Sequence, residues 1–147
     1  MRTRVTVAIV AAALFWAGLA YNLSRPADYR SYHRTVLQVA AAAHDAAETG
    51  RLTGEQLLVH KATVLYADTA FDDAAKALAG AQKQFASQAP PDGKSRRLRA
   101  EMGPLLAREV TALGDTTQAT DDVSLRAGVR TLDGLAQQLD AFITAHQ

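Results

Sequence analysis

Residues 57–85, LLVHKATVLYADTAFDDAAKALAGAQKQF, carry the clearest hydrophobic periodicity in the chain. Large apolar side chains recur every seven residues, at Leu57, Val64, Phe71, Leu78 and Phe85. His60, Ala67, Ala74 and Ala81 follow the first four of them at a spacing of three. This heptad pattern is typical of an α-helix that buries one face, and its small residues allow a neighbouring helix to approach closely. We predict one helix that begins at Thr53 in a capping box and ends before Pro90.

Two segments outside this stretch show the same kind of helical spacing. In residues 27–49 an apolar stripe precedes Gly50, which fits a C-terminal cap; the stripe comprises Tyr29, Tyr32, Val36, Ala40, Ala43 and Ala47. From residue 122 to the C-terminus the apolar positions alternate by four and three; they are Leu125, Val129, Leu132, Ala136, Leu139 and Ile143, widened by Phe142. Asp121 and Asp122 fit the N-terminal cap of this last helix.

A further helix is predicted from residues 92–95 to about residue 113. Its apolar face comprises Leu98, Met102, Leu105, Leu106 and Leu113. Because proline removes a backbone hydrogen bond, Gly103-Pro104 predicts a kink or a new helix start. Residues 114–122, rich in Gly, Asp and Thr, are predicted to form a loop.

These patterns predict an all-α protein. The chain contains 31 alanines, the strongest helix formers, and shows no convincing strand-like alternation. Four amphipathic helices joined by short loops predict an antiparallel four-helix bundle. The alternative is a three-helix bundle in which residues 27–49 form a stalk.

The N-terminus has the features of a membrane segment. Arg2 and Arg4 precede an uncharged run of 19 residues, 5–23, which as a helix spans roughly 28 Å, about one hydrocarbon core. Trp16 and Tyr21 lie toward its far end, where aromatic rings suit the membrane interface. We predict an uncleaved anchor in residues 1–23 and an extracytoplasmic bundle in residues 24–147. The alternative is a signal peptide cleaved after Ala20, which would give a secreted protein.

Composition excludes several classes of protein. The chain has no cysteine, so disulfides, thiolate metal sites and cysteine nucleophiles are excluded. Its formal net charge of +1 argues against general nucleic-acid binding. The Glu-x-x-His pairs of di-iron bundles and the Gly-x-Ser-x-Gly elbow of hydrolases are absent. We expect no catalytic residues, no resident metal and no cofactor, and the protein is predicted not to be an enzyme.

Two local features remain as candidate sites. His60, on the predicted seam, and Met102, on another helix, form a possible pair of axial ligands for non-covalent haem. The second feature is basic and combines two clusters: Arg25, Arg30 and Arg34, and Lys94, Arg96, Arg97 and Arg99. An outgoing first helix and a returning second helix bring these clusters to the membrane side, where each basic residue contributes around 1 kcal/mol of attraction to anionic lipid.

The sequence therefore predicts a non-catalytic, single-pass membrane protein with an extracytoplasmic interaction module. Its expected partners are the lipid bilayer and another protein that binds through helix–helix contacts. The alternatives are a periplasmic-type bundle that binds haem, a metal or a small ligand, and a sensor ectodomain that acts with a partner. No sequence motif identifies the partner.

Overall fold

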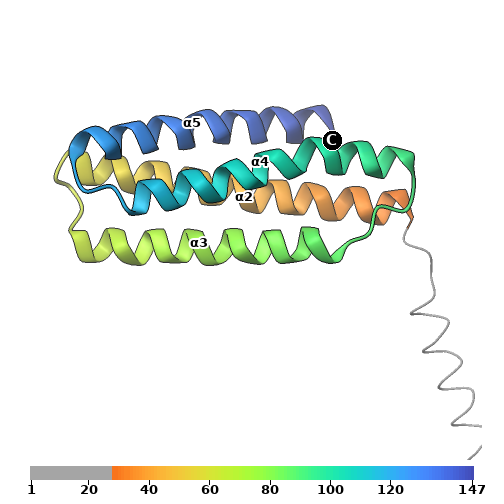
Figure 1. Ribbon diagram of the computed structural model, residues 1–147, viewed down its shortest axis with the longest axis horizontal. Coiled ribbons are helices and arrows are strands. Elements are labelled where there is room, and N and C mark those ends of the chain that lie inside the picture. The colour runs from red at the N-terminus through yellow and green to blue at the C-terminus, as the bar shows by residue number, and fades with distance from the viewer. Residues whose placement is uncertain (1–27) are drawn as a thin grey trace, which may run out of the picture.

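The computed structural model describes residues 28–147 and shows four α-helices. Helix α2 spans Tyr29–Leu58, α3 spans Val64–Ser87, α4 spans Gly93–Thr117 and α5 spans Asp122–Ala145 (Figure 1). Within these 120 positions no residue belongs to a β-strand, and each turn between helices has only four or five residues. The predicted all-α class is confirmed.

Consecutive helices run in opposite directions, as short turns require (Figure 1). Helix α2 packs closely on α3, α4 and α5, whereas no Cα atom of α3 lies within 8 Å of a Cα atom of α5. The bundle is therefore flattened, with α2 and α4 meeting across its short diagonal. Because α2 packs on three helices, the alternative in which it forms a stalk is wrong.

The core follows most of the predicted apolar stripes. On α3 the heptad positions from Ala67 to Phe85 are all buried, and Phe71 is only 3% exposed while its neighbour Asp72 is exposed. The α4 and α5 stripes are buried as well, with Leu125 and Ile143 half-buried at the two ends of α5. Tyr32, Met102, Leu132 and Leu139 are fully enclosed. The core draws on all four helices.

The predicted boundary between the first two helices is wrong. Gly50 does not end a helix and Thr53 does not begin one, because α2 continues through both to Leu58. Arg51 supports this continuity: its guanidinium donates to Glu48 at 2.8 Å and to Glu55 at 2.6 Å, pairs that exist only on an unbroken helix. Gly50 and Gly54 are buried packing positions, where the missing side chains admit α4 and α5.

The true end of α2 interrupts the predicted heptad helix. His60 adopts a left-handed conformation with φ of 56°. The N–H groups of His60 and Lys61 donate to the carbonyls of Leu57 and Gln56 at 3.0 and 2.9 Å, which is the Schellman arrangement that ends many helices. Helix α3 then starts afresh, with Thr63 accepting from the Tyr66 N–H. The seven-residue spacing from Leu57 to Val64 thus crosses a turn, and Val64 is exposed.

Helix α4 is longer than predicted and passes through Pro104 without a new start. Gly114 lies inside α4 rather than in a loop, and the loop is reduced to residues 118–121. Pro104 is exposed, so its ring does not disturb the core. The predicted cap of the last helix is confirmed: the Asp121 carboxylate accepts from the N–H groups of Val123 and Ser124.

The predicted membrane segment lies outside the described residues. Among the helices that the structure does describe, none combines the length and the apolar character that a membrane crossing requires. Trp16, Tyr21 and Arg25 fall in the same undescribed part of the chain.

Candidate functional site

Basic residues from two helices gather at one end of the bundle, which we call the basic end. It comprises the start of α2, with Arg30 and Arg34, and the start of α4, with Lys94, Arg96 and Arg97, all five exposed. The ammonium of Lys94 lies 5.8 Å from the centre of the Tyr29 ring, which joins the two helix starts. Figure 1 shows the start of α2, the α3–α4 turn and the C-terminus at this same end.

Arg99 has a different role from the other cationic residues of its cluster. Its guanidinium donates to the carbonyls of Phe85 and Gln88 at 3.3 and 2.7 Å and covers the Phe85 ring at 4.9 Å. A cation in this position neutralises the free carbonyls at the C-terminal end of α3. Arg99 therefore closes α3, and its charge is already engaged within the bundle.

The structure does not bring His60 and Met102 together. His60 is exposed in the α2–α3 turn, so its predicted place on a buried seam is wrong. Met102 is fully buried and lies 15 residues before the end of α4, which corresponds to roughly 22 Å along the helix axis. The α2–α3 turn lies at the end of the bundle toward which α4 runs (Figure 1). The two side chains therefore occupy different levels of the bundle.

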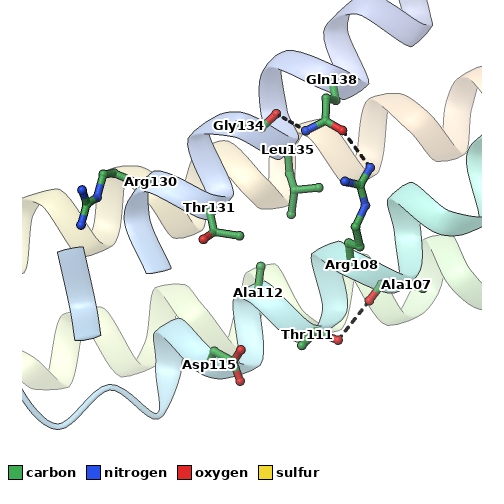
Figure 2. Close-up of a pocket in the computed structure, with 10 residues that line it drawn as sticks. All are labelled: Ala107, Arg108, Thr111, Ala112, Asp115, Arg130, Thr131, Gly134, Leu135 and Gln138. Carbon is green, nitrogen blue, oxygen red and sulfur yellow. Dashed lines mark hydrogen bonds between the residues drawn. The ribbon is translucent and has the colours of Figure 1, made fainter. Parts of the chain in front are cut away.

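A shallow groove of about 590 Å³ runs between α4 and α5 (Figure 2). Ala112 and Leu135 contribute to its apolar lining, and Gly134 leaves open space where a side chain would stand. Arg108 crosses the groove and donates to the Gln138 amide oxygen at 2.8 Å. The Thr111 hydroxyl is used within its own helix, donating to the Ala107 carbonyl. Arg108 and Thr111 are therefore already paired within the protein, and the charged side chains of Asp115 and Arg130 also line the groove, so its lining is mixed.

Glu109 is the one charged residue among the fully buried positions of the described helices. Neither carboxyl oxygen has a hydrogen-bond partner within the protein. Burial raises the pKa of Glu109 from 4.5 to about 8, and a weaker opposing effect comes from the main chain at Ala47 of α2. At neutral pH the protonated form of the carboxyl group is therefore favoured.

The sequence contains one signal for the burial of Glu109. Met102, Leu105 and Leu106 precede it and Leu113 follows it on one α4 stripe, at the spacing of a single helix face. A glutamate in the middle of such a stripe is a candidate for a buried carboxyl. Glu109 was not among the predicted site residues because the Glu-x-x-His pattern does not depend on which helix face carries the glutamate.

Within residues 28–147 no three histidine, aspartate or glutamate side chains are grouped so that they could hold a metal ion. Comparison of the chain with protein-family models, with curated proteins and with solved structures finds no match.

Proposed function

We propose that this chain is a non-catalytic, single-pass membrane protein whose helical bundle lies outside the cytoplasm and serves as an interaction module. The observation that carries the proposal is the basic end. Its exposed residues come from α2 and α4, and α2 is the helix that follows the uncharged segment of residues 5–23. Membrane insertion of that segment brings the basic end toward the lipid headgroups.

Electrostatics supports this orientation. Each basic residue near anionic lipid contributes around 1 kcal/mol, and the attraction fades within about 8 Å at physiological salt. Arg30, Arg34, Lys94, Arg96 and Arg97 are exposed at this end, so all five are available to a surface. Arg99 is left out of this lipid-facing set because it closes α3.

Membrane insertion is tested on the full chain with a C-terminal tag. We expect the tagged protein to stay with the membranes at alkaline pH. Release of a soluble product shortened by about 20 residues would mean a cleaved signal peptide instead of an anchor.

The orientation is tested with residues 24–147 and lipid vesicles. We expect weak, salt-sensitive sedimentation with anionic vesicles and none with neutral ones. Replacing Lys94, Arg96 and Arg97 by glutamine weakens it. The matched control replaces three basic residues outside the basic end, Lys61, Arg126 and Arg130, by glutamine and leaves it unchanged. Equal behaviour of the two triple variants contradicts the orientation. A purified protein that carries haem or metal at near-stoichiometric level contradicts the assignment as a pure interaction module.

A further inference from the structure

The end of the bundle opposite the basic end exposes large apolar side chains. Val59, Val64, Leu65 and Tyr66 lie at the α2–α3 turn, and Val123 lies in the first turn of α5. We call these five residues the apolar tip. Both segments lie at the left-hand end in Figure 1. Leu65 is 79% exposed and Val123 74%, whereas elsewhere in the described helices the exposed large hydrophobic residues are Leu52 and Val110, at 47% and 40%.

The fold does not require apolar residues at these positions. Thr63 caps α3, and the first α3 residue buried in the core is Ala67. Val64, Leu65 and Tyr66 thus form a helix turn that precedes the core contact, where polar residues would remain hydrated at no cost to packing. A group of exposed apolar side chains is typical of an interaction surface.

Acidic residues surround the apolar tip. Asp68 lies one turn further along α3, Asp121 and Asp122 adjoin Val123, and Asp115 lies in the last turn of α4. The basic residues of the same segments are Lys61 and Arg126, and Arg126 is 3.6 Å from Asp122 in an ion pair. The tip is therefore opposite in charge to the basic end, and its surroundings complement a basic ligand.

We propose that the apolar tip binds a segment of a partner protein that presents apolar side chains flanked by lysine or arginine; this rests on the proposed interaction function. Five side chains expose on the order of a few hundred Å², less than the roughly 800 Å² per partner of a standard protein interface. A short segment fits that area better than a second copy of the chain. The aspartates also repel an identical tip and an anionic lipid surface.

The test uses the full chain in phosphatidylcholine nanodiscs, with a photoreactive benzoylphenylalanine in place of Tyr66 or, as the control, of Val110. The probes are two synthetic 18-residue amphipathic helices of leucine with lysine and of leucine with glutamate. With the leucine–lysine peptide we expect at least tenfold more adduct at position 66 than at 110. We also expect a tenfold loss with the leucine–glutamate peptide, and a similar loss in the Leu65→Asp variant.

Other outcomes overturn the proposal. Adducts that form mainly at position 110 would place peptide binding on the side of the bundle. The apolar tip would then not be the binding surface, although the proposed interaction function would not be contradicted. Equal yields of adduct with the two peptides would contradict the proposed role of charge complementarity in binding. Adducts between two copies through position 66 assign the tip to self-association, and adducts with lipid assign it to the membrane.

Discussion

The two sides of the bundle are packed differently. On the α2–α5 side, Gly54 lies so close to α5 that an added Cβ would be 2.5 Å from a methyl carbon of Val129. Arg51 of α2 also reaches toward Asp133 of α5, at 3.7 Å. On the α3–α4 side fewer residues of the two helices lie close together than in any other neighbouring pair, and open hollows of about 490 and 320 Å³ lie between them.

This difference shows how helix separation is encoded. Glycine at the contact lets two helix backbones approach, as Gly50 and Gly54 do for α2. On the α3–α4 side, Ala79 and Ala107 are exposed and line the hollow instead of filling it. Small residues therefore mark a tight contact when they are buried and a groove when they are not.

The largest expected effect concerns Glu109, in the centre of the bundle between α4 and α2. Its folded-state pKa of about 8 exceeds the ordinary 4.5, so the folded protein holds a proton that the unfolded chain releases. The stabilisation from this bound proton is therefore fully present below about pH 4.5. The free energy of unfolding falls as the pH rises from there toward 8. The loss is roughly 5 kcal/mol, at 1.36 kcal/mol per pKa unit.

Glu109→Gln tests this expectation by removing the titration. Denaturant unfolding from pH 5 to pH 9 should show the variant gaining stability relative to the parent as the pH rises. Asp115→Asn, on the exposed face of the same helix, is the control, and its effect stays below about 0.5 kcal/mol. A constant difference between Glu109→Gln and the parent across this range would mean that water or another group solvates the carboxyl.

The second prediction tests the tight side directly. Gly54→Ala places a methyl group against Val129, so α2 and α5 must separate or Val129 must leave its rotamer. Overpacking of this kind costs about 1–3 kcal/mol, measured as a lower free energy of unfolding. An unchanged or higher stability would show that the α2–α5 contact gives way easily, and the contrast between the two sides would disappear.

The third prediction concerns the α2–α3 turn, which joins a helix of the closely packed α2–α5 side to a helix of the more open α3–α4 side. His60→Gly relieves the left-handed conformation of a residue with a side chain and should raise the free energy of unfolding by about 1 kcal/mol. His60→Val, which places a β-branched side chain at the same φ, should lower it. A thermal melt of the two variants gives the order, and loss of stability in both would indicate that the imidazole itself makes a stabilising contact.

These residues also explain what the sequence could and could not predict. The regular stripe of α5 and the Asp121 cap were predicted correctly because periodicity and capping are local. The α2–α3 boundary was predicted wrongly because Gly50 fits a C-terminal cap and Thr53 begins a capping-box pattern. Here Gly50 and Gly54 instead serve contacts with α4 and α5, which no local pattern reveals.

The candidate site was predictable to a similar degree. The convergence of the exposed arginines at the start of α2 with Lys94 follows from helix direction, and the Tyr29–Lys94 contact agrees with it. The engagement of Arg99 depends on the position of the α3 carbonyls across the turn. The apolar tip was not predicted, because the sequence pattern placed Val64 in a continuous buried heptad. In the structure Val64 is the first residue of a new helix.

The smallest expected effect comes from the outer surface of α3. Gly80 lies inside the helix and is exposed, and a Cβ added there meets nothing within 4 Å. Alanine restricts the unfolded chain and favours the helix, so Gly80→Ala should raise the free energy of unfolding by about 0.5–1 kcal/mol. Because Gly54→Ala is the same chemical change with the opposite expected sign, denaturant unfolding of both variants isolates the surroundings of the glycine. A loss of stability in Gly80→Ala would mean that other atoms cover this face of α3 in the intact protein. The description of this face as exposed would then be wrong.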